Sequence, residues 1–254
     1  MAHHHDGDIL YAMAMSDKAQ MFNALYRRHA RNRAVVLVPL LEHAVSVDNA
    51  DLLKKVLAIG ACANNVHSNG LRRMLHYWVT VDGSQEALQA LLDHGAVVDA
   101  PTATGRTALQ AVAIGCKDNP GAATALLVAG ANPNYRNPNN PNDPTALKLA
   151  LGNTHMGVTI ALIQYGANIH DSEYDGNTAL HIAVLSNQVG AISVLVKAGA
   201  NINWRGRNCP APLHMAMDKN NPRSVRILRE LGAEKNLRDG TGQTPLQRAL
   251  TEHA

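Results

Sequence analysis

The stretch of residues 175–203 decides the fold, and it reads D-G-N-T-A-L-H-I-A-V-L-S-N-Q-V-G-A-I-S-V-L-V-K-A-G-A-N-I-N. A turn containing glycine leads into a short helix with a threonine at its N-terminal cap. Leu180, Ala183 and Val184 fall at positions i, i+3 and i+4 and therefore share one helical face. After a polar loop, a second helix ends at Gly199, because glycine readily adopts the left-handed conformation of helix ends. Two helices this short cannot bury their apolar faces alone, so the unit requires copies of itself on either side.

Two independent features mark copies of this unit along the chain. Gly-Ala pairs recur at steps of 35, 35, 36, 33 and 33 residues, and they begin at Gly60, Gly95, Gly130, Gly166, Gly199 and Gly232. The segments T-A-L-Q-A-V-A, T-A-L-K-L-A-L, T-A-L-H-I-A-V, A-P-L-H-M-A-M and T-P-L-Q-R-A-L begin at Thr107, Thr145, Thr178, Ala211 and Thr244. Two markers with one spacing indicate a repeat array, which grows along one axis without a central core.

The period near 33 and the T-P-L-H-x-A pattern resemble the ankyrin-repeat family from about Val38 to the C-terminus. The resemblance implies an all-α solenoid of stacked helix-turn-helix units, joined by fingers built from β-turns or hairpins. We expect a tail and a capping helix in residues 1–33 and the repeat array in residues 34–254. The repeats are expected to start near residues 38, 72, 107, 145, 178 and 211, with a half repeat from residue 244.

Four departures from the repeat pattern give further expectations. Pro39 should occupy the first helical position of its repeat, where its missing N–H costs little. Tyr77 and Trp78 replace small residues, so the second repeat should pack irregularly. The third repeat has two extra residues within 115–120, between its helices. The finger at 136–144 has three prolines and three extra residues, so it should be enlarged and free of helix.

The composition limits the classes of protein that fit. Hydrophobic residues make up 46% of the chain but aromatic residues only 4%, which suits a core of short, closely packed helices. A formal charge of +3 neither favours nor excludes an anionic partner. Cys62, Cys116 and Cys209 have no spacing typical of a disulfide framework or a zinc site. The sequence has no secretory signal pattern, so we expect a cytoplasmic protein, with translocation into a host cell as the alternative.

No pattern in the sequence predicts catalysis, a cofactor or a metal site. Residues 100–107 only faintly resemble a phosphate-binding loop, and the repeat pattern already explains them. His181 and His214 occupy the histidine position of T-P-L-H, and the resemblance implies that their imidazoles bond to backbone near the turn. His155 has the same interpretation. The run of three histidines from His3 indicates a tail or an added segment rather than a metal site.

The resemblance implies binding through finger tips and exposed first-helix positions. Trp204, with Arg205 and Arg207, is the main candidate, since Trp and Arg are common anchors of interfaces. The alternative is that Trp204 folds back onto a neighbouring finger. From Trp204 onward the chain has nine Lys or Arg and five Asp or Glu, which favours an acidic partner. The full set of candidates is Tyr135, Arg136, Tyr174, Asp175, Asn177, Leu185, Ser186, Trp204, Arg205, Arg207, Asn208, Asp218 and Lys219.

The most economical interpretation is a non-enzymatic adaptor that binds a partner protein or peptide in its concave surface. A microbial effector that targets host proteins would have the same sequence features. Nucleic-acid binding through Arg27 to Arg33 and the basic C-terminal half is a second alternative. An enzyme, or a targeting subunit of an enzyme, is a third. The half repeat leaves the oligomeric state open, because it could stack on a second copy.

Overall fold

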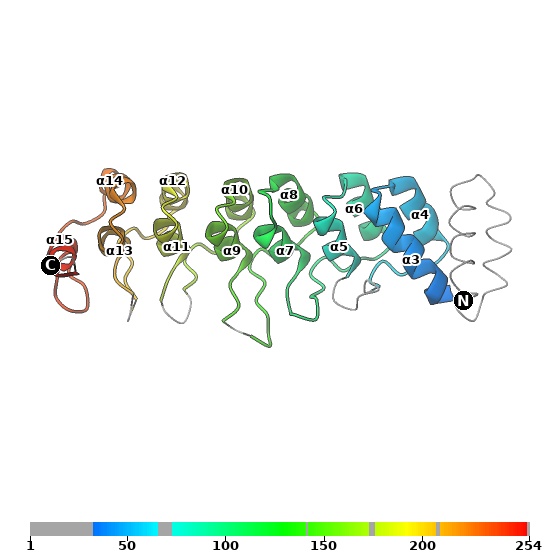
Figure 1. Cartoon of the computed structure of the whole chain (residues 1–254), viewed down its shortest axis with the longest axis horizontal. Coiled ribbons are helices and arrows are strands. Elements are labelled where there is room, and N and C mark those ends of the chain that lie inside the picture. Colours follow the sequence, from blue (N-terminus) through cyan, green and yellow to red (C-terminus); the bar gives the residue numbers. More distant parts are fainter. Residues whose placement is uncertain (1–32, 66–72, 141, 173–175, 207–208, 253–254) are drawn as a thin grey trace. The chain divides into compact units, whose positions relative to one another are not determined.

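The computed structural model describes residues 33–65, 73–140, 142–172, 176–206 and 209–252, and short helices dominate them (Figure 1). The helices are α3 (Arg33–Ser46), α4 (Ala50–Ala58), α5 (Met74–Thr80), α6 (Gln85–Asp93), α7 (Ala108–Ile114), α8 (Pro120–Val128), α9 (Ala146–Gly152), α10 (Met156–Gln164), α11 (Ala179–Leu185), α12 (Val189–Lys197), α13 (Pro212–Asp218), α14 (Pro222–Glu230) and α15 (Pro245–Glu252). The chain forms two compact units, Met1–Ala111 and Val112–Ala254. No described helix has the length and apolar character needed to span a membrane.

From α5 to α14, a first helix of seven residues alternates with a second helix of nine. The two members pack on each other in the pairs α5–α6, α9–α10, α11–α12 and α13–α14, and pairs within a unit stack on their neighbours, as α12 does on α10 and α14. Five first helices, from α7 to α15, begin one residue after the starts predicted at 107, 145, 178, 211 and 244. The predicted all-α repeat fold is therefore confirmed.

The repeated unit forms because its apolar face is continuous and its ends are fixed. In α11 the buried side chains include Leu180, Ala183 and Val184, the three residues expected on one face. Gly199 ends α12 with φ +98, a left-handed conformation that costs glycine little. The fingers close as hairpins: for example, the Thr102 N–H donates to the Arg106 carbonyl at 2.9 Å.

Asparagine side chains connect successive fingers. Asn134 donates through Nδ2 to the Gly166 carbonyl at 3.0 Å, and its Oδ1 accepts from the Asn168 N–H at 2.7 Å. Asn64 makes the same pair of bonds to Gly95 and Val97. One side chain thus satisfies backbone groups one repeat away, which fixes the spacing between neighbouring fingers.

Both predicted insertions are present. Five residues separate α7 from α8, whereas three separate α11 from α12, so the extra two lie where expected. They place Asp118 against the start of α10 in the next repeat. Its carboxylate accepts from the N–H groups of Gly157 at 2.7 Å and Val158 at 2.9 Å. Residues 129–145 between α8 and α9 exceed the equivalent 165–178 by three, and the described part of this finger is not helical.

The prediction for Pro39 is wrong, because this residue lies inside α3 and not at its start. The buried stripe of α3 consists of Leu37, Leu40, Leu41, Ala44 and Val45. Leu37 extends this stripe to the N-terminal side of Pro39, at the spacing of a continuous helix. Pro39 itself is exposed, so its ring is accommodated on the solvent side. Burial of the apolar stripe outweighs the one backbone hydrogen bond that proline removes.

The second repeat is irregular, as the sequence predicted. Trp78 occupies the place taken by Ala183 in α11 and is buried, and its indole N–H donates to the Ser84 carbonyl at 2.9 Å. Gly83 makes room for the ring, since a Cβ atom there would lie 2.2 Å from Trp78 Cδ1. The predicted N-terminal cap, the arginines before Arg33 and the histidine run lie outside the described residues.

Candidate functional site

The histidines of the T-P-L-H position are structural. The Nε2 atoms of His76, His181 and His214 lie 2.8, 3.1 and 3.1 Å from backbone carbonyl oxygens of the following finger. All three imidazoles are buried. The predicted bonds of His181 and His214 to backbone near the turn are therefore confirmed. Among the described residues, no group of three or more His, Cys, Asp or Glu side chains could hold a metal ion.

His155 differs from this pattern. It is buried, but its side chain forms no hydrogen bond in the described part of the chain, so the expected bond to backbone is wrong for this residue. His155 precedes the first residue of α10. Asp118 already accepts from the N–H groups of Gly157 and Val158, the donors that a side chain at the start of α10 would satisfy.

Lys148 replaces the histidine in the fourth repeat and forms part of a charged cluster. Its ammonium group is buried and lies 3.9 Å from Asp171 Oδ2. Arg136, a predicted binding residue, forms an ion pair with the same carboxylate oxygen. Asp171 therefore interacts with two cations from two different segments. Because Arg136 is engaged within the chain, it contributes first to the packing of this finger.

Trp204 lies in the finger between α12 and α13, and its side chain is both exposed and anchored. Its relative exposure is 38%. The indole N–H donates to the carbonyl oxygen of Gly176, in the preceding finger, at 3.4 Å. One edge of the ring thus contacts a neighbouring finger, as the alternative interpretation expected, while the remaining surface stays open to solvent. Such an arrangement fixes the ring orientation before any partner arrives.

A recess of about 740 Å³ is lined by Arg205, the residue that follows Trp204 in the chain. It lies between the fingers that precede α13 and α15, and its lining is Arg205, Gly206, Cys209, Pro210, Asp239, Gly240, Thr241 and Arg248. Arg205 is exposed and donates to the carbonyl oxygen of Arg238 at 2.6 Å. Within the described residues its guanidinium forms no ion pair, so its charge remains available to an anionic group in the recess.

Asp239 supplies the carboxylate at the wall of this recess. Its Oδ1 accepts from the Thr241 N–H at 2.9 Å, from Thr241 Oγ1 at 2.7 Å and from the Gln243 N–H at 3.0 Å. Arg248 donates to its Oδ2 at 3.1 Å. Burial alone would raise the pKa of Asp239, but these hydrogen bonds outweigh burial and hold the pKa well below its ordinary value. The carboxylate is therefore ionised, and Arg248 is the one cation that pairs with it among the described residues.

Arg248 is a residue that the sequence analysis missed. It stands where α13 has Met215 and α11 has Ile182, so the repeat pattern predicts an ordinary packing residue. Instead its guanidinium bridges Asp239 and Asp218, with a distance of 2.8 Å from Nε to Asp218 Oδ2. A charged residue at a position that is apolar in other repeats was the signal that could have identified it.

The other predicted residues are dispersed over the second unit. Asn177 Oδ1 accepts from the Cys209 thiol at 3.0 Å, and Asp218 pairs with Arg248. Lys219 is exposed and follows α13 directly. Leu185 and Ser186 lie at the C-terminal end of α11, about one helix length from the finger that precedes it.

Two groups of candidates need separate mention. Tyr135 is half-buried beside Arg136, in the finger after α8. Four predicted residues lie outside the described part of the chain: Tyr174, Asp175, Arg207 and Asn208. The structure therefore brings together Asn177, Trp204 and Arg205, near the Asp218–Arg248 pair, out of the larger predicted set.

Comparison with known proteins agrees with this architecture. Residues 111–206 match the family described as ankyrin repeats (3 copies). No curated protein sequence matches the chain. The solved ankyrin repeat domain of Bcl-3, described as a unique member of the IkappaB protein family, is similar in fold with a TM-score of 0.72 and 24% identity. That alignment covers 82% of this chain and 92% of the Bcl-3 chain.

The human ASB11 ankyrin repeat domain is also similar, with a TM-score of 0.66 and 23% identity. In that comparison 84% of this chain and 97% of the ASB11 chain are covered. Both likenesses extend well beyond the residues that the family match covers. Residues 111–206 are thus ankyrin repeats, and the chain has the fold of an ankyrin-repeat domain.

Proposed function

We propose that this protein is a non-enzymatic adaptor of the cytoplasm, and that the fingers around Trp204 bind an acidic segment of a partner protein. One observation carries the proposal: the exposed Trp204 indole is held by a hydrogen bond to Gly176, and the next residue, Arg205, lines a recess with a guanidinium that forms no ion pair among the described residues. Tryptophan and arginine are the residues most often found to dominate interface energetics.

The electrostatics of the recess supports an acidic partner. Arg205 and Arg248 line it, and the one carboxylate in its wall, on Asp239, is saturated by hydrogen bonds from within the chain. A glutamate or aspartate entering the recess would meet Arg205 without having to displace an intramolecular ion pair. The excess of Lys and Arg over Asp and Glu after Trp204 would also speed the approach of an acidic segment.

The same geometry disfavours an enzyme. General acid–base catalysis needs a group whose pKa lies near the working pH. The carboxylate of the recess, Asp239, instead has a pKa held far below its ordinary range, and its oxygens are occupied. Three of the four buried histidines in the described chain, His76, His181 and His214, contact finger carbonyls and connect neighbouring repeats.

A binding measurement tests the proposal. Peptides selected from a library rich in Asp and Glu would be titrated into the full chain by calorimetry. Trp204→Ala should weaken binding by about 2 kcal/mol, roughly thirtyfold, with thermal unfolding unchanged. Arg205→Gln should weaken acidic peptides and spare neutral ones. Tyr165→Ala is the matched control, since Tyr165 is an exposed aromatic residue at the end of α10. Equal affinity for wild type and Trp204→Ala would exclude this site.

A further inference from the structure

The second helices α8, α10 and α12 lie in one row in the second unit, and α10 packs against both of the others (Figure 1). In each helix the second, fifth and ninth residues lie on the side opposite the buried residues. These residues form the outer face, and all of them are exposed or half-buried: Gly121, Thr124, Val128, Gly157, Ile160, Gln164, Gly190, Ser193 and Lys197.

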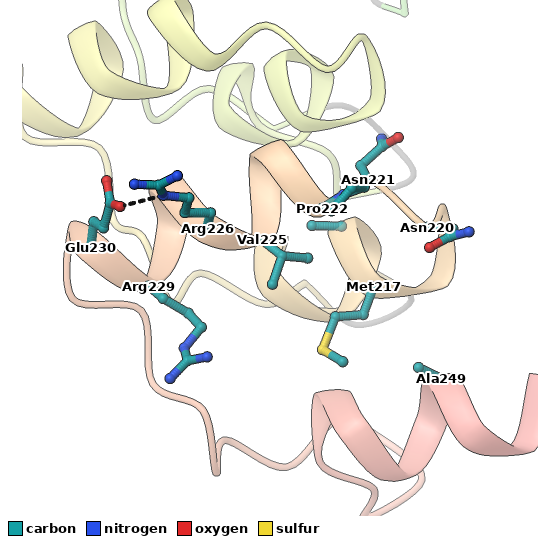
Figure 2. A pocket seen from close by; sticks show the side chains of 10 residues that line it. Met217, Asn220, Asn221, Pro222, Val225, Arg226, Arg229, Glu230 and Ala249 are labelled. Carbon is teal, nitrogen blue, oxygen red and sulfur yellow. Dashed lines mark hydrogen bonds and ion pairs between the residues drawn. The ribbon is translucent and has the colours of Figure 1, made fainter.

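The outer face is almost free of charge. Among the residues of these three helices only Lys197, at the end of α12, is charged. The corresponding places in other second helices hold charged side chains, for example Lys54 in α4. In α14 they hold Arg226 and Glu230, which form an exposed ion pair with 2.8 Å between Nε and Oε1 (Figure 2). The repeat therefore accepts charge on this side, and the fold does not require the lack of charge on α8 and α10.

Apolar side chains take the place of charges on this surface. Val128, the last residue of α8, is 68% exposed. Ile160, in the middle of α10, is half-buried, and Tyr165, which directly follows α10, is 42% exposed. Depletion of charge together with exposed apolar and aromatic side chains is typical of the centre of a protein interface.

The polar side chains of the outer face are of kinds that can pair with their own copies. Gln164 is exposed, and its side chain forms no hydrogen bond within the described residues. An amide both donates and accepts, and so do the hydroxyls of Thr124 and Ser193. Ser193 Oγ donates to the Val189 carbonyl at 3.1 Å, which leaves its lone pairs available. Two copies of this face can therefore meet without placing a donor against a donor.

A second copy of the chain is the occupant that these features fit. In a two-fold dimer both copies use the same surface, so a charge near its centre meets the same charge of the other copy. Like charges disfavour such a contact, and the arginines of α14 would incur that cost. The centre of the outer face, around Ile160, has no charge to repel its copy.

The one charge of the outer face lies where a dimer can accommodate it. With the two-fold axis along α10, α8 of each copy lies opposite α12 of the other. Lys197 then lies near the C-terminal end of the other copy's α8, where unpaired carbonyl groups favour a cation. The two lysines are about two helix spacings apart, roughly 16–20 Å, which exceeds the screening length of about 8 Å at physiological salt.

The size of the outer face indicates a weak dimer. A nine-residue helix is about 13 Å long, and packed helices lie about 8–10 Å apart, so three of them cover roughly 13 by 30 Å. With the relief of the side chains, two copies would bury about 1,000 Å² in total, which is at the lower end of specific interfaces. We therefore expect a dissociation constant in the micromolar range.

We propose that two copies of this chain associate through the outer face, with Ile160 of each copy on the two-fold axis. Val128 packs against the aliphatic stem of the other copy's Lys197. No finger residue belongs to this face, so each copy keeps its own recess lined by Arg205. The dimer does not rest on the proposed function, but it would offer two finger sites and so strengthen binding of a partner with two acidic segments.

Sedimentation velocity of the full chain, at concentrations from about 1 µM to 1 mM, tests the proposal. Wild type should shift from monomer to dimer across this range. Ile160→Glu and Val128→Glu should each weaken association by at least roughly tenfold, because they place like charges in the interface. Gln89→Glu is the matched control, since it makes the same change of charge at the place in α6 that corresponds to Ile160. Circular dichroism melting curves check that all variants fold.

A mixture of two variants tests the symmetry. Ile160→Glu mixed with Ile160→Lys should associate more strongly than either variant alone, because opposite charges then meet at the axis, and misfolded proteins could not show this rescue. Trp204→Ala should dimerise like wild type, so this result and the peptide-binding result are independent. A wild type that stays monomeric at about 1 mM would overturn the proposal. Dimers that persist in both Ile160→Glu and Val128→Glu, or that are lost in Gln89→Glu or Trp204→Ala, would also overturn it.

Discussion

The Nε2 atom of the buried His181 lies 3.1 Å from the carbonyl oxygen of Pro210, which is 29 residues further along the chain. The other ring nitrogen, Nδ1, lies 2.8 Å from Thr178 Oγ1 and accepts from the Thr178 N–H at 3.2 Å. One imidazole thus completes the cap of its own helix and holds the next finger. His214 makes the corresponding contact to Gln243 at 3.1 Å. Where a repeat has this histidine, the side chain therefore couples it to the following repeat, in addition to the apolar contacts between helices.

Replacing His181 by alanine should lower the free energy of unfolding by about 1–3 kcal/mol, because the half-buried Pro210 carbonyl and the cap of α11 each lose their partner. Urea unfolding followed by circular dichroism measures the change. His170→Ala is the control, since His170 is exposed in a finger, and it should stay within about 0.5 kcal/mol of wild type. Similar midpoints for both variants would show that the imidazole contact to Pro210 contributes nothing to stability.

Gly83 and Trp78 should be strongly coupled. Gly83→Ala places a Cβ atom against the buried indole, 2.2 Å from Cδ1, so we expect a loss of about 1–3 kcal/mol from overpacking. Trp78→Ala alone should also destabilise, because it leaves a cavity in the second repeat. In the double variant the clash is absent, so the two losses should not add. Additive losses in a double-mutant cycle would contradict the close contact between these residues.

The sequence was sufficient to predict those parts of the structure that depend on local spacing. Thr178 and Gly199 mark the ends of one unit, and the same markers placed five first helices within one residue. The two-residue insertion before α8 was also predicted by counting. The rule that proline favours the first helical position gave a wrong prediction for Pro39, because the buried apolar stripe of α3 continues to Leu37, on the N-terminal side of the proline.

Contacts between repeats were harder to predict, because they depend on how side chains from different units align in space. Asp118 caps a helix 39 residues away, and Lys148 shares Asp171 with Arg136. Nothing in the spacing of these residues distinguishes them from exposed charges.

Replacing Asp171 should lower the free energy of unfolding more than replacing Arg136, one of its two partners. Asp171→Asn leaves the buried ammonium of Lys148 and the Arg136 guanidinium without their shared carboxylate, so we expect a loss of about 2 kcal/mol. Arg136→Gln is the matched comparison. Its side chain is 36% exposed, so the loss should stay below about 1 kcal/mol. Chemical denaturation of the three proteins measures both values, and a larger loss for Arg136→Gln would place the main contact of Asp171 elsewhere.

The free energy of unfolding should depend on pH through the ionisation of Asp239. Its pKa in the folded state lies below the value of about 3.9 that an aspartate has in an unfolded chain. A depressed pKa contributes stability that is present above the unfolded value and is lost as the pH falls below it. Asp239→Asn removes this ionisation while keeping the size of the side chain. At pH 7 the variant should be less stable by about 2 kcal/mol, since the bonds from Thr241, Gln243 and Arg248 lose a charged acceptor.

The difference between wild type and Asp239→Asn should shrink as the pH falls below about 4, because wild type then loses the same contribution by protonation. Denaturant unfolding at a series of pH values measures this convergence. The group that faces Asp239 is Arg248, which also forms an ion pair with a second carboxylate, that of Asp218. Asp218→Asn is therefore measured in parallel to separate the two carboxylates. A constant difference between wild type and Asp239→Asn from pH 7 to pH 3 would mean that hydrogen-bond geometry, and not the charge of Asp239, stabilises the last finger.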